Sequence, residues 1–370
     1  MEFTVKKSVF QKELNFVQGV IEKKATIPVL QHFLIRSVGR DQIKIIGTDM
    51  DLTIQCQCEA EIQKPGILVV QGRKLYDIVR NLPEADINLK LDEKSWAVLQ
   101  CERSRFRIAG LPEEHFPAVP EPKSSTRSIS AEVLKCLLDH TIYAIAKGES
   151  QRYALNGAQL ELSANVGRMV ATDGHRLSLV EHKSAALGSG EVKALIPRKA
   201  IVELEKLLSD AKGDEEVLFD QDFNHLYFQL GNRTLTTRTL SGKFPDYKQV
   251  IPEDLSHRIT CERVALNAAI ERASLMADDR SRGVKVRFWQ GHAYISACSS
   301  EVGEANETIP VNYNGAEIAT GFNHEYLIDF LQSTNSEQIY IDFKDVTSQA
   351  IFQPTNGDFT YLGVIMPMRV

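Results

Sequence analysis

Three copies of one pattern follow one another along this chain of 370 residues, and this repetition limits the fold more than any other feature. Each copy opens with a short strand-like run and continues into an amphipathic helix, in residues 3–22, 127–146 and 257–277. A pair of strands follows, in which Thr48, Thr172 and Ser296 recur at intervals of 124 residues. The pattern predicts three domains of one architecture.

The second half of each copy keeps the same order. A strand leads into a second, shorter helix, where Arg73, Arg198 and Asn323 lie 125 residues apart. Hairpins follow, and Gly231-Asn232 and Asn356-Gly357 are dipeptides of two-residue β-turns. Linkers with Phe-Pro at matching places separate the copies, and proline predicts that they are extended. We expect an α+β fold with antiparallel sheets in three repeated domains, at residues 1–121, 127–252 and 257–370.

Apolar spacing indicates which side of each helix packs. The helix after Ser130 should leave Lys135, Asp139 and His140 outside and bury Leu134, Leu137, Leu138, Ile142 and Ile145. The shorter helices should bury Leu75, Ile78, Val79 and Leu82, or Ile201, Leu204 and Leu208, and should expose Arg73, Arg80, Arg198, Lys199 and Lys206. Basic helix faces on a chain of net charge −6 are typical of a surface that meets a polyanion, but an ordinary solvated face explains them equally well.

Composition excludes several classes of protein. Hydrophobic residues make up 43% and charged residues 25%, which is typical of an ordered globular chain. No apolar run approaches the roughly 18 residues of a membrane span, and the start lacks a signal core, so we expect a cytoplasmic protein. The six cysteines form no C-x-x-C pair, which favours reduced core residues over structural zinc. We expect no metal and no cofactor.

The strongest catalytic candidates are Asp173 and His175, which flank a glycine. No nucleophile elbow, zinc-protease helix, Walker A loop or dinucleotide-binding glycine pattern accompanies them, and Asp-Gly is equally typical of a tight turn. Turn or surface roles are expected for Asp49 and Asp51, whose surroundings do not fit an EF-hand. We expect no catalytic residue, and a small-molecule hydrolase using Asp173 and His175 is a minor alternative.

The end of the chain, residues 361–370, is apolar to the last residue, so something must cover it. One interpretation is a final edge strand with a tail docked on its own domain. The other is that Met366 and Met368, beside Pro367, form an adaptable pocket for partner peptides. Composition favours the first.

Seven pieces of sequence carry a resemblance that runs through the whole chain in order: residues 26–30, 47–49, 104–106, 152–157, 171–177, 244–247 and 366–369. Together they resemble the bacterial DNA sliding clamps, the β subunits of the replicative DNA polymerase, and ATDGHRL with the terminal MPMR are the most specific. The resemblance implies a non-catalytic processivity factor of DNA replication. It implies a head-to-tail homodimer whose six domains close a ring, with strands outside and helices lining a hole for duplex DNA. A closed ring cannot leave the DNA that it encloses, so only the helices that face the hole need be basic.

The resemblance also implies a pocket between the second and third domains. The pocket takes short peptides of the replicative polymerase α subunit, the clamp loader, repair polymerases and mismatch-repair or ligase-type proteins. Its residues, called the pocket set below, are Leu155, Thr172, Gly174, His175, Arg176, Leu177, Pro245, Val250, Asn323, Tyr326, Val346, Ser348, Val364, Met366, Pro367, Met368 and Arg369. This chain departs from the best-known members at Gln249, where a basic residue often stands, and at Val370 instead of Leu.

Two further sets follow from the resemblance. The residues expected to face DNA, called the DNA set, are Lys24, Arg73, Lys147, Arg152, Tyr153, Arg198, Lys199 and Lys206. The residues expected at the dimer contact, called the interface set, are Lys74, Ile78, Leu82, Arg103, Arg105, Phe106, Ile108, Leu275, Glu301 and Glu304.

The dimer contact is also motivated by charge. Alternation in residues 103–108 places Phe106 and Ile108 on one face and three arginines on the other, a load suited to a protected edge strand that needs an acidic partner. Glu301, Glu304 and Glu307 offer that partner in the third domain of a second copy. A β-rich protein scaffold with the same repeat and no DNA role is the remaining alternative.

Overall fold

The computed structural model describes residues 1–21, 26–92, 95–122, 127–148, 151–183 and 191–369. The chain divides into two compact units, one formed by Met1–Glu132 with Lys199–Thr239, the other by Val133–Arg198 with Leu240–Val370. Each unit therefore contains one terminal repeat and part of the middle repeat.

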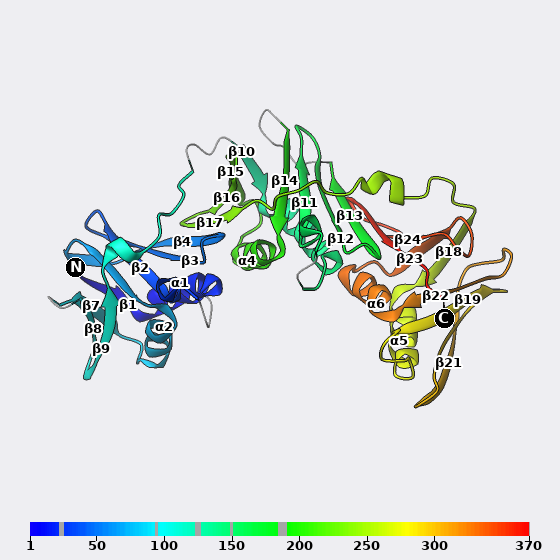
Figure 1. Cartoon of the computed structure of the whole chain (residues 1–370), viewed down its shortest axis with the longest axis horizontal. Coiled ribbons are helices and arrows are strands. Elements are labelled where there is room, and N and C mark those ends of the chain that lie inside the picture. Colours follow the sequence, from blue (N-terminus) through cyan, green and yellow to red (C-terminus); the bar gives the residue numbers. More distant parts are fainter. Residues whose placement is uncertain (22–25, 93–94, 123–126, 149–150, 184–190, 370) are drawn as a thin grey trace. The chain divides into compact units, whose positions relative to one another are not determined.

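Unit 1 is built on a 13-stranded sheet with the strand order β10-β15-β16-β17-β4-β3-β2-β6-β9-β8-β7-β1-β5. Two helices of the first repeat, α1 and α2, lie side by side on its strands (Figure 1). The first repeat supplies β1 (Glu2–Lys6), α1 (Lys7–Val17), β2 (His32–Val38), β3 (Gln42–Thr48), β4 (Leu52–Glu59), β5 (Glu61–Lys64), β6 (Ile67–Gln71), α2 (Gly72–Asn81), β7 (Asp86–Leu91), β8 (Trp96–Cys101) and β9 (Ser104–Leu111). The middle repeat adds β10 (Arg127–Ser130), α4 (Arg198–Ser209), β15 (Glu216–Gln221), β16 (His225–Leu230) and β17 (Arg233–Arg238).

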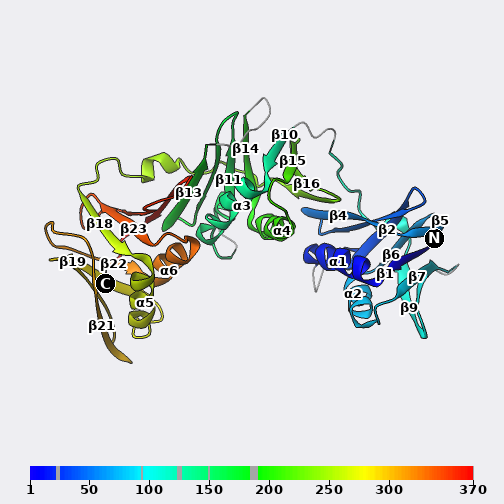
Figure 2. The ribbon, with the colours of Figure 1, turned by 180° about the vertical axis from the view of Figure 1, so that it is seen from behind.

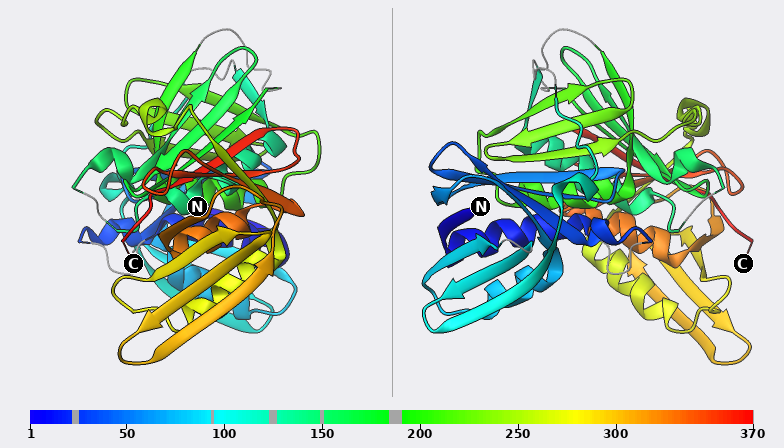
Figure 3. Two further views of the ribbon diagram at one scale, coloured as in Figure 1. Left: turned by 90° about the vertical axis from the view of Figure 1, so that its right-hand side faces the viewer. Right: turned by 60° about the vertical axis from the view of Figure 1, so that its left-hand side comes forward.

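Unit 2 contains an 8-stranded sheet, β14-β11-β12-β13-β25-β24-β23-β18, and a 4-stranded sheet, β21-β20-β19-β22, whose strands are plain in Figure 3. Helices α5 and α6 pack together beside these strands (Figure 2). The middle repeat supplies α3 (Ala131–Asp139), β11 (Gly157–Leu162), β12 (Gly167–Thr172), β13 (Arg176–His182) and β14 (Val192–Pro197). The third repeat supplies β18 (His257–Glu262), α5 (Arg263–Ser274), β19 (Gly283–Trp289), β20 (His292–Ser299), β21 (Gly303–Pro310), β22 (Ile318–Asn323), α6 (His324–Ser333), β23 (Gln338–Phe343), β24 (Ala350–Pro354) and β25 (Thr360–Ile365).

The predicted opening of each repeat is confirmed. A strand runs directly into a helix at β1 and α1, at β10 and α3, and at β18 and α5. In α1 the residues Phe10, Leu14 and Val17 are fully buried at helical spacing, so the helix is held by packing of one apolar face. The fold is α+β with antiparallel strand pairs, as the repeat predicts.

Helix α3 is shorter than the apolar stripe predicted, because it ends at Asp139 instead of continuing to Ile145. Thr141 is fully buried, and its Oγ1 donates to the carbonyl of Leu137 at 2.7 Å. This side-chain bond occupies a carbonyl of the last turn, and a short 3₁₀ turn, Ile142–Ala144, follows.

His140 also differs from its expected place on the outer side of that helix. Its ring lies edge-on to the rings of Phe359 and Tyr361, with centroid distances of 4.9 and 4.8 Å. Burial lowers the pKa of His140. The helical pattern could not show this because both aromatic partners belong to the third repeat.

Two strand predictions are also corrected. Gly231-Asn232 is the expected two-residue turn, since Leu230 and Arg233 are paired in register. At Asn356-Gly357, by contrast, β24 ends at Pro354 and the next strand begins only at Thr360. Asn356 is engaged elsewhere, because its Oδ1 accepts a bond of 2.8 Å from Ser336 Oγ.

Thr48 and Thr172 were predicted to have Ser296 as their counterpart in the third repeat. The structure shows that this counterpart is Ser299. Thr48 and Thr172 end β3 and β12, and each Oγ1 accepts from the backbone amide two residues later. Ser299 ends β20 and accepts in the same way from the amide of Glu301 at 3.3 Å. The repeat therefore lengthens between its second and third copies before this turn.

The described parts of the linkers and of the chain end differ from the prediction of extended linkers and a final edge strand. Each linker contains a short 3₁₀ turn, Glu113–His115 in the first and Tyr247–Val250 in the second. The last strand, β25, is not an edge strand, because it pairs with β13 on one side and β24 on the other. Residues 361–365 of the apolar end thus lie in the interior of a sheet.

Two strand pairs join neighbouring repeats. In unit 1, β17 of the middle repeat pairs with β4 of the first, and in unit 2, β13 of the middle repeat pairs with β25 of the third. The first joint also holds a buried ion pair, in which the Arg233 guanidinium donates to both oxygens of Glu13 at 2.9 and 3.0 Å. The middle repeat is therefore continuous with a neighbour on each side.

The described cysteines are free thiols. Cys56, Cys58, Cys101 and Cys261 are buried, as predicted, and burial raises the pKa of Cys58 and of Cys261 to about 12. Such thiols remain protonated near neutral pH and behave as small apolar residues. Two cysteines depart from the prediction, because Cys136 is half-buried and Cys298 is exposed.

Candidate functional site

The turn between β12 and β13 is built by its own side chains. Thr172 Oγ1 donates to the carbonyl of Arg176 at 2.6 Å and accepts from the amide of Gly174 at 3.1 Å. Gly174 has φ of 93°, a conformation that favours glycine. Asp173 Oδ1 accepts from the amides of His175 and Arg176 at 2.9 and 3.0 Å. The turn interpretation of the Asp-Gly pair is confirmed.

The same geometry argues against the hydrolase alternative, because the carboxylate of Asp173 is already engaged in the turn. Both oxygens of Asp173 are engaged, since Oδ2 accepts from Arg176 Nε at 3.1 Å, while the side chain of His175 is exposed. Asp49 has the matching role in the first repeat, because its Oδ1 accepts from the amides of Asp51 and Leu52.

Arg176 is the buried centre of this site, with 3% of its surface exposed. Beyond Asp173, its guanidinium donates to Asp329 Oδ2 at 2.6 Å and to the carbonyl of Tyr143. It also lies over the rings of Tyr143 and Tyr326, at 5.3 and 4.5 Å from their centroids. A buried cation needs such complete pairing, so Arg176 fastens the middle repeat to α6 of the third.

An apolar cluster lies beside this arginine. Leu177 and Val364 come from paired strands, and Phe244 and Tyr247 come from the second linker; all four are buried in one cluster. Val250 is partly buried against it. The cluster gives a site next to Arg176 an apolar floor.

The C-terminal tail is held on both sides of the joint. The amide of Met366 donates to the carbonyl of His175 at 3.0 Å, and the amide of Met368 donates to the carbonyl of Gly321 at 2.9 Å. The Met366 side chain nevertheless stays 40% exposed. The two interpretations of this tail are therefore compatible, because the backbone is docked while a methionine faces outward.

The whole pocket set lies in unit 2. Its buried members form the floor, namely Leu155, Thr172, Arg176, Leu177 and Val364. Its half-buried members are Val250, Asn323, Tyr326, Ser348, Pro367 and Met368, and its exposed members are Gly174, His175, Pro245, Val346, Met366 and Arg369. Asn323 and Ser348 also have local roles, since Asn323 Oδ1 accepts from the amide of Glu325 at the start of α6 and Ser348 Oγ donates to Asp345.

Sequence reasoning missed Asp329 and Tyr143, which complete the surroundings of Arg176. Neither belongs to the pieces of sequence that carry the resemblance. The available signal is spacing, because Tyr326 and Asp329 are three residues apart on one helix and so share a face.

The DNA set is distributed over both units, and Lys24 lies outside the described residues. Arg73 and Lys206 are exposed as expected, and Tyr153 is 70% exposed. Arg198 is a correction: it is half-buried, and its guanidinium donates to the carbonyls of Ile142 and Ile145 at 3.0 and 3.3 Å.

Several lysines of the DNA set have acidic neighbours in the same chain. Lys206 contacts Glu203 at 2.7 Å, Lys199 contacts Asp49, and Lys147 lies 3.9 Å from Asp329. The positive charge of these positions is thus partly compensated within the protein.

The interface set falls on α2 and the residue that follows it, on the end of α5, and on β9 and β21 with the turns before them. Residues 104–109 of β9 have registered partners only in β8, and β21 is the outermost strand of its sheet. Phe106 is 38% and Leu275 75% exposed, whereas Ile108 and Leu82 are buried within the chain. Glu307 is not free for another chain, because Arg272 holds both its oxygens.

Comparison with known proteins places these features in a family. The N-terminal, central and C-terminal domains of the DNA polymerase III beta subunit match residues 1–120, 128–246 and 248–369. The chain belongs to the DNA polymerase III beta subunit family. The beta sliding clamp of Pseudomonas putida is 36% identical over 374 residues, with all of both chains covered.

Solved clamp structures agree over the full length. The DNA polymerase III beta subunit of Pseudomonas aeruginosa matches with a TM-score of 0.94 at 34% identity, and the sliding clamp of Caulobacter crescentus with 0.93 at 32%, each covering all of both chains. A further Pseudomonas aeruginosa clamp that matches was solved bound to griselimycin. The three-domain clamp fold expected from the sequence is therefore shown.

No group of three or more His, Cys, Asp or Glu side chains among the described residues is arranged to hold a metal ion. No helix in this part of the chain is both long and apolar enough to cross a membrane.

Proposed function

We propose that this chain is the processivity clamp of a bacterial DNA polymerase, in which two copies join head to tail and encircle duplex DNA without reading its sequence. One observation carries the proposal: all three repeats match the beta subunit domains in order and over the full length. The proposed domains are residues 1–121, 127–252 and 257–370. The chain acts as a non-catalytic subunit, and the engagement of Asp173 by its turn and by Arg176 supports that role.

Encirclement of DNA explains why a chain of net charge −6 needs only a few basic residues toward DNA. A ring that cannot fall off DNA needs only weak phosphate contacts, and tight ones would oppose sliding. The DNA set supplies these contacts in our proposal. Its partial compensation by Asp49, Glu203 and Asp329 supports weak contacts.

The pocket set is the proposed site for partner peptides. Its apolar floor with a few polar groups suits an extended peptide that carries leucine or phenylalanine. The proposed partners are the polymerase α subunit, the clamp loader, repair polymerases and mismatch-repair or ligase-type proteins. Because these partners work on the bacterial chromosome, we propose that the protein acts in the cytoplasm.

Retention on DNA tests the proposal. The protein is loaded with clamp loader and ATP onto nicked circular DNA, and half of the sample is cut once with a restriction enzyme before gel filtration. A ring stays on the circle and slides off the linear DNA. Equal retention on both would show surface binding, and a dimer retained on neither would favour the scaffold alternative.

A further inference from the structure

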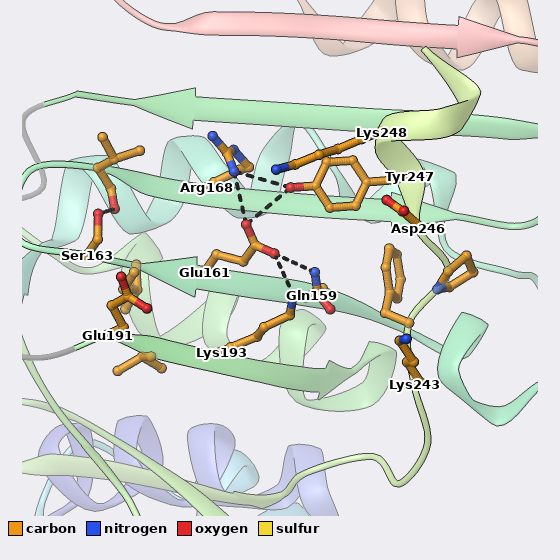
Figure 4. Close-up of a pocket in the computed structure, with 15 residues that line it drawn as sticks. Gln159, Glu161, Ser163, Arg168, Glu191, Lys193, Lys243, Asp246, Tyr247 and Lys248 are labelled. Atoms are coloured by element: carbon orange, nitrogen blue, oxygen red, sulfur yellow. Dashed lines mark hydrogen bonds and ion pairs between the residues drawn. The ribbon is translucent and has the colours of Figure 1, made fainter.

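One hollow of unit 2 lies beside the second linker and is lined mainly by residues outside the pocket set. It has a volume of about 670 Å³ and lies between strands β11, β12 and β14 and the segment 243–248 (Figure 4). Its centre is polar, with Glu161 and Arg168 on the strands and Tyr247 on the linker. The same linker segment contributes Pro245 to the pocket set.

These three side chains are joined by mutual hydrogen bonds. Tyr247 donates its phenol to Glu161 Oε2 at 3.1 Å, and Arg168 donates to the same carboxylate oxygen at 3.1 Å and to the phenol at 3.2 Å. Glu181 holds Arg168 from the next strand, and Lys193 lies 3.2 Å from the other oxygen of Glu161. Burial and the Glu161 carboxylate raise the pKa of Tyr247, so the phenol remains a donor.

The anchored residue also belongs to the apolar floor. Tyr247 is 5% exposed and shares a cluster with Leu177 and Val364, against which Val250 packs. Tyr247 is the first residue of the 3₁₀ turn that ends at Val250. Its hydroxyl is thus tied to the sheet while its ring and its turn form one wall of the pocket set.

The first repeat has a related arrangement, in which a base takes the place of the acid on the central strand and one of the two facing bases is kept. Arg36 faces Lys44 and Ile67 across its strands, as Glu161 faces Arg168 and Lys193. Here the acid is on the linker: Glu121 lies 3.2 Å from Arg36 and 4.0 Å from Lys44. A hollow also lies beside this linker, and no residue of the pocket set lines it.

We infer that Glu161, Arg168 and Tyr247 are positioning residues that fix the segment 244–250, and so set the shape of the pocket wall formed by Pro245 and Val250. The inference rests on the proposed function. A wall left loose must be ordered whenever a peptide binds, and that ordering weakens affinity.

The test uses full-length Tyr247→Phe, which keeps the ring and removes the hydroxyl. The probe is a fluorescent peptide with the clamp-binding motif of the polymerase α subunit, measured by anisotropy. We expect about tenfold weaker binding, the size of one hydrogen bond to a charged group. Hydrogen exchange should accelerate in residues 244–251 and stay unchanged in residues 1–121. The dimer should be unchanged in sedimentation.

The first repeat supplies the matched control. Glu121→Gln weakens the equivalent anchor and should leave peptide affinity at the wild-type value. The inference is overturned if Tyr247→Phe binds as tightly as the wild type, or if both variants lose affinity equally. A wild-type chain that binds no such peptide removes the proposed pocket as well, so the two failures are distinguishable.

Discussion

Arg176 shows how one side chain can join two repeats. It donates to Asp173 beside it in sequence and to Asp329 on α6, and it is almost fully buried. Burying a guanidinium is favourable only when its donors are paired, so the cost of losing a partner exceeds the value of an exposed ion pair. The joint therefore depends on a residue in each repeat.

Replacing Asp329 by alanine should destabilise unit 2. We expect the free energy of unfolding to fall by about 2 to 3 kcal/mol, because the buried guanidinium loses a carboxylate. Urea denaturation followed by circular dichroism measures the change. Asp358→Ala, at an exposed position, is the control, and a loss no larger than that of the control would contradict the role assigned to Asp329.

The distant hydrogen-bond partners of individual residues could not be predicted from the sequence. The resemblance places Arg176 in the pocket set, but its partner Asp329 lies 153 positions away. Arg198 was expected to be exposed because it begins an amphipathic helix, yet carbonyls from residues 142 and 145 hold it. Local spacing contains no information on such distant acceptors.

At the scale of elements, the strand-to-helix openings were predictable because periodicity changes sharply where β1, β10 and β18 end. The interior position of β25 was not predictable from its own sequence. An apolar chain end suits an edge strand as well as an interior one, and only the pairing with β13 decides. Element types were thus accessible from the sequence, while neighbours across repeats were not.

The tail after β25 gives a prediction at this scale. Removing residues 366–370 deletes the bonds of Met366 to His175 and of Met368 to Gly321, but leaves β25 paired on both sides. We expect loss of peptide binding with an intact dimer, as measured by anisotropy and sedimentation. Unchanged peptide affinity would remove the tail from the proposed pocket.

At the scale of the whole molecule, ring closure is expected to depend on the free edges of β9 and β21. Charge reversal of Arg103 and Arg105 together with Leu275→Ala should convert the dimer to a monomer in sedimentation, because it removes both the charge match and an exposed apolar contact. Peptide binding should survive in this variant. A dimer of unchanged affinity would place the joint elsewhere.

DNA contact is the second expectation for the assembled ring. Joint replacement of Arg152 and Tyr153 by alanine should weaken binding to open linear DNA several-fold, and the wild-type affinity should fall steeply with salt. Electrophoretic mobility shifts at several salt concentrations measure both effects. Tight binding that ignores salt and these substitutions would contradict weak electrostatic contact.

The pairing of β17 with β4 has a consequence for how the protein is made. The ribosome releases β4 long before β17, and until then the outer edge of β4 has open hydrogen-bonding groups that invite pairing with another nascent chain. The same delay applies to β13, whose partner β25 is synthesised much later. A chain cut short before β25 therefore leaves the edge of β13 open to pairing with another nascent chain.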